Sequence, residues 1–243
     1  MNLIADIQYF APFSFYKISY KYSHILIEQC ETYQKMSFRN RCRIAGAEGV
    51  VDLSIPIAGG RGQKTLMKEV RIAAGRSWQA QHWKTIVSCY SRSPWFDYYR
   101  DGLQKLFEEP VGFLMDWDLR CLEWSLRVLG MDQQVGLTDR YQKVYESGEG
   151  ADWRGRLGPK GLRDIDGSGG ADRFGGTGRS LDAGRSPDAN RSPDANRSPD
   201  AGRSGDAGRY RQVFEERTGF IPNLSILDLL FCEGKEAIRY IRS

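Results

Sequence analysis

The stretch NLIADIQYF, residues 2–10, predicts a buried strand that runs into an aromatic turn. Short apolar runs rich in isoleucine and aromatic residues are typical of buried strands. A second such run, HILIEQC, occupies residues 24–30. In open α/β sheets the loop after the first strand is a common place for a ligand, at the carboxyl edge of the sheet. The beginning of the chain therefore predicts a sheet and indicates where a site would lie.

More strands and then a helical half are expected beyond these two runs. The segments GVVDLSIPI (49–57) and MKEVRIA (67–73) nearly alternate in polarity, which predicts a hairpin closed by the basic loop AGGRGQKT. Helices are predicted over 78–90, with Ser77 as N-cap, and over 93–109, with Ser93 preceding Pro94 at the first helical position.

A third helix is predicted over 113–129, where apolar residues recur at helical spacing and Gly130 supplies a stop. The predicted fold class is α/β, with early strands in a mixed sheet, a helical half after them, and a disordered low-complexity insertion. The 243 residues are enough for one ordinary domain with a sizeable core.

Tandem hexapeptides of the type RSPDAN define the insertion, which we place at 164–208, between a main domain at 1–163 and a C-terminal segment at 209–243. Almost no apolar side chain is available there to offset the entropy of ordering, so a disordered linker is predicted. A β-solenoid is the alternative, but it needs an apolar residue in each turn. The segment GFIPNLSILDLLF (219–231) predicts a helix capped by Asn223 that returns to the core.

Composition restricts the classes of function. A net charge of +4 is too mild to indicate nucleic-acid binding, and no apolar run approaches the roughly 18 residues of a membrane span. Five scattered cysteines without a CxxC pair indicate a reducing, cytoplasmic setting. Two histidines exclude a multi-histidine metal site, and no metal or cofactor is assigned.

Three arginines alternate in SFRNRCRI (37–44), which as a strand would put Arg39, Arg41 and Arg43 on one face. The nearest acids in sequence are Glu31 before the row and Glu48 after it. The row is therefore interpreted either as a solvated face or as a site for an anion. Basic residues such as Lys64 in the neighbouring loop favour a phosphate-bearing ligand, which the planar arginine fork can bind through two hydrogen bonds.

Aromatic and histidine side chains are the remaining candidates. Tyr9 follows the first strand, and it is either a core residue or part of a ligand site. His82 shares a helical face with Trp78 and Ile86, which is more typical of a core histidine than of a catalyst, although a general acid or base role stays open. No GxGxxG or P-loop fingerprint is present.

Several separated blocks resemble the WbqC-like family of bacterial proteins: DIQYFAPFSFYKI, FRNRCRI, LSIPI, QHWKTI, SPWFDYY and GFIPNLSILDLLFCEG. The resemblance implies a role in surface polysaccharide and O-antigen synthesis. Arg39, Asn40 and Arg41 match the family's Asn-Arg block, and His82 matches its His-Trp block. Many relatives carry His-Gln-Pro after the first strand, where this chain has Asp6-Ile7-Gln8.

The leading hypothesis is a cytoplasmic transferase acting on a nucleotide-activated amino sugar or another anionic small molecule. The rival is a non-catalytic adaptor that binds an anionic partner and uses the repeat as a tether. Under the first hypothesis the residues have these roles: His82 and Asn40 catalytic, and Arg39, Arg41, Lys64 and Tyr9 ligand-binding.

Overall fold

A computed structural model of the chain describes residues 1–59, 64–74, 77–145, 150–158 and 209–243. Residues 1–163 and 207–243 form one compact unit, so the chain on both sides of the repeats belongs to the same body. The repeats lie outside the described residues, and so do residues 60–63 of the loop AGGRGQKT. The prediction of a disordered linker therefore stays a prediction.

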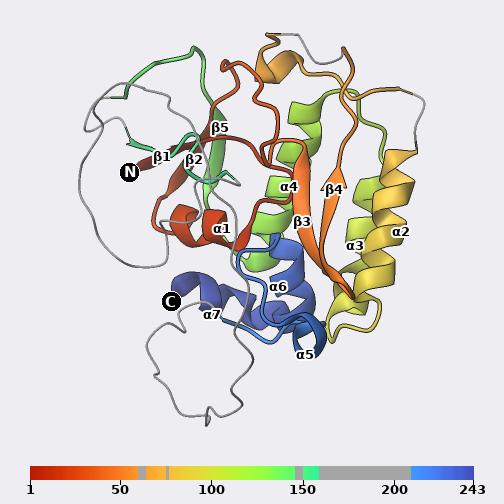
Figure 1. The fold of residues 1–243 in the computed structure, drawn as a ribbon. Coiled ribbons are helices and arrows are strands. Elements are labelled where there is room, and N and C mark those ends of the chain that lie inside the picture. Colours follow the sequence, from red (N-terminus) through yellow and green to blue (C-terminus); the bar gives the residue numbers. More distant parts are fainter. Residues whose placement is uncertain (60–63, 75–76, 146–149, 159–208) are drawn as a thin grey trace, which may run out of the picture. The chain divides into compact units, whose positions relative to one another are not determined.

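A parallel sheet of four strands in the order β5-β2-β1-β6 forms the base of the fold (Figure 1). Strand β1 spans Asn2–Ala5 and β2 spans His24–Ile27, where the two apolar runs predict strands, and the two strands pair in parallel. Strands β5 (Gln134–Leu137) and β6 (Ala151–Asp152) complete the sheet and were not predicted. The chain leaves β1 toward β2 and β5 and returns with β6 on the other side, so the strand order reverses at β1.

The hairpin consists of β3 (Arg41–Gly46) and β4 (Gly49–Ser54), paired antiparallel. The predicted hairpin between 49–57 and 67–73 is wrong. Its second segment forms the 3-10 helix η1 (Met67–Glu69), and only an isolated bridge joins Ile57 to Ile72. The arginine-rich run lies closer in sequence and reaches β4 through a tight turn at Gly49, whose positive φ suits glycine.

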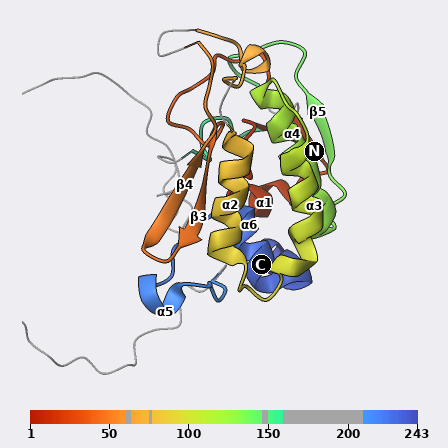
Figure 2. The same cartoon turned by 90° about the vertical axis from the view of Figure 1, so that its right-hand side faces the viewer.

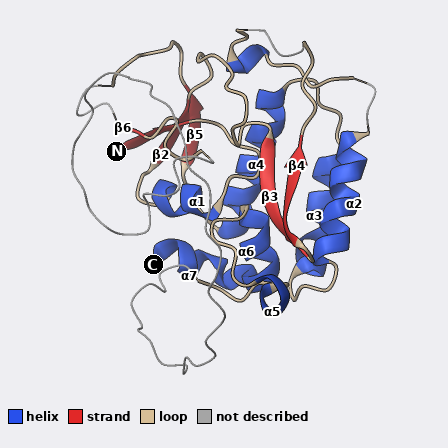
Figure 3. Cartoon of the chain, viewed as in Figure 1, coloured by secondary structure: helices blue, strands red, loops and turns tan. Residues whose placement is uncertain are grey.

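Helices α2 (Trp78–Tyr90), α3 (Phe96–Glu108) and α4 (Leu114–Leu129) form the helical half (Figure 3). Figure 2 shows them between the β3–β4 hairpin on one side and β5 on the other. Gly130 ends α4 in the left-handed conformation, as predicted. Two cap predictions differ: α3 begins at Phe96 rather than beside Pro94, and the Ser77 side chain makes no cap hydrogen bond.

Shorter helices complete the description: α1 (Phe13–Ser19), α5 (Glu215–Thr218), α6 (Ile226–Glu233), η3 (Gly234–Glu236) and α7 (Ala237–Arg242). The C-terminal segment is tied to the loop after β1, because Ile226 N donates to Ala11 O and Phe13 N donates to Leu224 O. Ser225, not Asn223, caps α6, and the Asn223 Oδ1 instead accepts from Ser14 N.

The mixed α/β class, with early strands followed by helices, is therefore confirmed, and two late strands add to the sheet. None of the helices described here is both long enough and apolar enough to cross a membrane.

Candidate functional site

The carboxyl ends of β1, β2, β5 and β6 meet at one edge of the sheet, which we call the carboxyl edge. Ligands of open parallel sheets bind at this edge, next to the strand where the order reverses. Here that strand is β1, and the segment that leaves it begins with Asp6. The side chains below are described from this point outward.

Arg39 is buried at the carboxyl edge and is neutralised by two acids. Its guanidinium lies 2.8 Å from Asp6 Oδ1, and its Nε donates to Glu31 Oε1 at 2.9 Å. Burial raises the pKa of Asp6 and of Glu31, and the positive charge of Arg39 opposes that rise in both. Arg39 is therefore neither solvated nor free to bind an anion, because Asp6 and Glu31 occupy its guanidinium.

The three arginines do not form one surface. Arg39 precedes β3 and is only 3% exposed, whereas Arg41 and Arg43 lie on the less buried face of that strand. Arg43 pairs with exposed Asp52 on β4 at 3.3 Å. Arg41 differs from both, because its Nε is buried without a hydrogen-bond partner among the described residues. Arg41 is therefore the arginine of the row with capacity to bind something else.

The structure brings Tyr9 and His82 together. The Tyr9 hydroxyl and His82 Nδ1 are 3.0 Å apart, both side chains are buried, and their rings stack at 5.8 Å between centroids. Burial lowers the pKa of His82 to about 4, opposed by a backbone hydrogen bond with Ser54. The imidazole is thus neutral near pH 7, and with its proton on Nε2 it accepts from the Tyr9 hydroxyl.

Asp118, in the second turn of α4, was not predicted from the sequence. Its side chain is fully buried, and neither carboxylate oxygen has a hydrogen-bond partner among the described residues. Burial raises the pKa of Asp118 well above its usual range, although the positive charge of Arg39 acts against this. Burial therefore favours the protonated form of this carboxyl, which can donate a hydrogen bond.

Half-buried Tyr33 connects Asp118 with the arginines. Burial raises the pKa of Tyr33, the negative charge of Asp118 adds to that rise, and Arg39 and Arg41 oppose it. The charges of all three groups therefore act on one phenol. We call this group the Asp118 cluster, and its members are Tyr9, Tyr33, Arg39, Arg41 and Asp118.

A second polar network joins three strand ends. Glu28, just after β2, accepts from Thr138 Oγ1 at 2.8 Å, from Cys30 N at 2.8 Å and from Arg154 Nη1 at 3.1 Å. Arg154 also binds Asp152 through Nε and Nη2. Although burial acts to raise the pKa of Asp152, the hydrogen bonds and charge of Arg154 lower it. Here every charge has an opposite partner.

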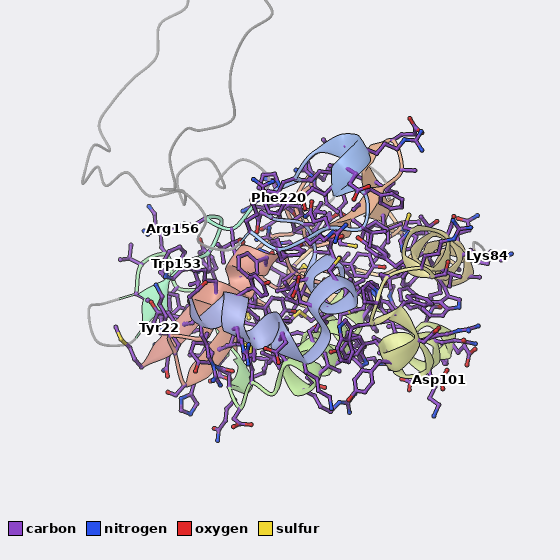
Figure 4. All side chains as sticks on the ribbon, turned by 90° about the horizontal axis from the view of Figure 1, so that it is seen from below. Tyr22, Lys84, Asp101, Trp153, Arg156 and Phe220 are labelled. Carbon is purple, nitrogen blue, oxygen red and sulfur yellow. The ribbon has the colours of Figure 1, made fainter. Side chains whose placement is uncertain are left out.

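Aromatic side chains cover the outer part of this network. The Arg154 guanidinium lies 4.8 Å from the ring centre of Tyr145 and 5.2 Å from that of Tyr141. Arg156 lies 5.8 Å from the ring centre of Trp153, and Figure 4 shows both side chains at the outside of the molecule. The segment after β6 therefore carries alternating arginine and aromatic contacts at the carboxyl edge.

Two predicted residues contribute less directly. The Asn40 amide donates to Ile55 O at 3.0 Å and its backbone carbonyl accepts from Ile55 N, so this side chain holds the chain after β4. Lys64 is exposed, one residue before Thr65, whose carbonyl accepts from Tyr33 N. Neither residue is shown to contact the Asp118 cluster.

Two of the site residues that the sequence analysis did not predict, Asp118 and Glu28, can be recognised from their positions in the sequence. Asp118 is an acid within the apolar stripe of a helix, between Leu114 and Cys121, where a charge is expected only with a partner or a role. Glu28 is a polar residue directly after an apolar strand. Asp152 and Arg154 carry no such signal, because the two-residue strand before them is too short to recognise.

The described residues contain no group of three or more His, Cys, Asp or Glu side chains placed to hold a metal ion. No curated protein and no solved structure matches the chain. Residues 8–153 match the family model described as the WbqC-like protein family, and this range covers the loop after β1 from Gln8 onward, both polar networks up to Asp152, and His82. The chain belongs to the WbqC-like protein family.

Proposed function

We propose that this protein acts in surface polysaccharide and O-antigen synthesis by transferring a group onto a nucleotide-activated amino sugar bound at the carboxyl edge beside β1. The observation that carries the proposal is the Asp118 cluster, in which a buried donor, Arg41 Nε, and a buried carboxyl, Asp118, both lack hydrogen-bond partners among the described residues. Buried polar groups are nearly always hydrogen-bonded, so a ligand that supplies the missing partners best explains these two groups.

The residues have distinct roles in this proposal. Arg41 binds the diphosphate, since a guanidinium with a free Nε offers a charge-assisted hydrogen bond. Arg39 is held by Asp6 and Glu31, so it positions these loops without contacting the substrate. Asn40 likewise positions the chain after β4, and Lys64 adds charge at the surface.

Proton transfer is assigned to Asp118 rather than to His82. A histidine with a pKa of about 4 is a weak base near neutral pH. Asp118, whose pKa is raised, holds a proton that it can give to the leaving group, and the resulting carboxylate then accepts the proton that the attacking amine releases. The Tyr9 hydroxyl is held by His82 Nδ1 at 3.0 Å. His82 therefore positions Tyr9 within the Asp118 cluster.

The test uses the full chain incubated with nucleotide-activated amino sugars and candidate acyl or aminoacyl donors, with products measured by mass spectrometry. We expect transfer with the wild-type protein and a loss of at least tenfold in kcat/KM for Arg41→Ala, matching about 1.5–3 kcal/mol for a charged hydrogen bond. Asp118→Asn should lower kcat more than it raises KM, because it removes the proton.

The matched control is Arg43→Ala, two residues along the same strand, whose side chain pairs with exposed Asp52. Its kcat/KM should equal that of the wild-type protein. Equal activity in Arg41→Ala and wild-type protein would exclude the assigned role of the cluster. No observation on the described residues favours the adaptor alternative, which depends on the repeats.

A further inference from the structure

A separate hollow of about 560 Å³ lies between α3, the last turns of α4 and η3. Its wall contains the aromatic rings of Tyr98, Tyr99 and Trp124 together with Arg127 and Lys235. The wall holds two cations and no carboxylate, and neither cation makes an ion pair with an acid of the described residues. The hollow therefore offers the exposed Tyr98 ring beside unneutralised positive charge.

This hollow lies away from the Asp118 cluster. Arg127 follows Asp118 by nine residues on α4, which corresponds to about 13 Å along the axis at 1.5 Å per residue. Gly130 ends α4 and β5 begins four residues later, so the hollow lies toward the amino edge of the sheet. It is a different place from the substrate site proposed above.

Gly102 is the unusual residue of the wall. It stands in the middle of α3, where glycine costs roughly 1 kcal/mol relative to alanine. A Cβ added there would meet Trp124 Nε1 at 3.5 Å, an ordinary contact, so packing within the chain does not require glycine. Its neighbour Asp101 lies at the outer surface in Figure 4. The missing side chain leaves space beside the edge of the Trp124 indole.

Tyr99 gives a second, independent observation. Its side chain is only 4% exposed, and its hydroxyl is buried without a hydrogen-bond partner among the described residues. The neighbouring Tyr98 ring is 59% exposed and carries the Lys235 ammonium 5.3 Å from its centre. An orphan hydroxyl, an exposed ring and an ammonium are thus close together on one wall.

We infer that this hollow binds a nucleoside phosphate, with the base against Tyr98 and the Trp124 edge and the phosphate on Lys235 and Arg127. Bases stack on aromatic side chains, and phosphate pairs with arginine and lysine. The carbonyl end of α4 disfavours an anion, but Gly130 N and Met131 N already bind two of its last carbonyls. The orphan Tyr99 hydroxyl then gains a partner from the ligand.

Binding is measured by titration calorimetry on the full chain carrying Arg41→Ala, so that the proposed substrate site is disabled. The probes are uridine monophosphate and adenosine monophosphate, with inorganic phosphate and the free nucleosides as separate arms. We expect a nucleotide to bind at least tenfold more tightly than inorganic phosphate or the matching nucleoside, since the hollow recognises both parts.

Adding Gly102→Leu should remove this binding while raising Tm, because leucine fills the hollow and is a better helix former than glycine. Arg127→Ala should weaken nucleotide binding at least fivefold, and Lys105→Ala, on α3 but outside the wall, should leave it unchanged. Absence of nucleotide binding in the Arg41→Ala protein would overturn the inference. So would binding that survives Gly102→Leu, or phosphate binding as tight as nucleotide binding.

Discussion

Glu28 and Asp118 are both fully buried carboxyl groups near the carboxyl edge, but their surroundings differ. Glu28 accepts hydrogen bonds from Thr138, Cys30 and Arg154, whereas both oxygens of Asp118 are without partners among the described residues. The hydrogen bonds of a satisfied buried carboxyl offset the free energy that its burial costs. For an unsatisfied carboxyl that cost remains, and it is retained where a ligand or a reaction uses the group.

The largest expected effect comes from breaking the satisfied network. Arg154→Met leaves Glu28 buried and Asp152 without its cation, and losing one partner of a buried ion pair costs about 3–5 kcal/mol. Urea denaturation of the variant should show a loss of this size in the free energy of unfolding.

Arg156→Met is the control for this change, because Arg156 is exposed and its guanidinium contacts only the Trp153 ring face in the described network. We expect a loss below about 1 kcal/mol, the scale of an exposed cation–π contact. Equal losses in the two variants would mean that burial of Glu28 does not matter, and the comparison with Asp118 would fail.

The Tyr9–His82 pair gives the next effect, as a dependence on pH. The folded-state pKa of His82 is about 4, below the unfolded value near 6.5. Its contribution is therefore complete above pH 6.5 and is lost as the pH falls toward 4, in total about 3 kcal/mol at 1.36 kcal/mol per pKa unit.

Stability measured in urea from pH 7.5 to 4 should fall more steeply for the wild-type protein than for His82→Gln, which lacks the titrating ring. Parallel curves would show that His82 is not neutral and buried in the folded protein, and would return it to the list of bases for catalysis.

Asp118→Asn tests the other member of the comparison between Glu28 and Asp118, and here the variant should be the more stable protein at high pH. The amide replaces a neutral acid of the same shape, so the free energy of unfolding at pH 4 should change by no more than about 1 kcal/mol. Because the folded-state pKa of Asp118 is raised, the wild-type protein loses stability relative to the variant as the pH rises above the unfolded pKa.

Urea denaturation of both proteins at pH 4, 5, 6 and 7 measures this difference. A difference that stays constant with pH would indicate that the pKa of Asp118 is not raised in the folded protein. The proposed acid would then have to be sought elsewhere in the cluster.

The sequence predicts some secondary-structure elements of this protein but not the ion pairs between distant segments. Strands β1 and β2 and helix α2 follow from local apolar patterns, and they appear at the predicted places. The partners of Arg39 do not follow, because Asp6 reaches it only through the loop after β1. Counting acids near Arg39 along the chain finds Glu31 but not Asp6, and it does not show that either acid pairs with Arg39.

The site follows the same rule. Tyr9 and His82 are named by the sequence, but their hydrogen bond depends on how α2 packs against the loop after β1. Asp118 is visible as an acid in an apolar stripe, yet only the structure shows that it has no partner. The two-residue strand β6 gives too little pattern to predict, so the Glu28–Arg154 network could not be anticipated.

The smallest effect is expected at Arg43, and it tests why three alternating arginines differ. Arg43 and Asp52 are 41% and 51% exposed and 3.3 Å apart, so the pair is screened by solvent. Arg43→Ala should lower the free energy of unfolding by no more than about 0.5 kcal/mol, and 0.5 M NaCl should abolish even this difference. Arg39→Ala, by contrast, leaves two buried acids without their cation and should be strongly destabilising at any salt concentration.

If both variants lost the same free energy of unfolding with the same dependence on salt, the three arginines would form one solvated face after all. The division into a structural, a ligand-binding and a surface arginine would then be wrong.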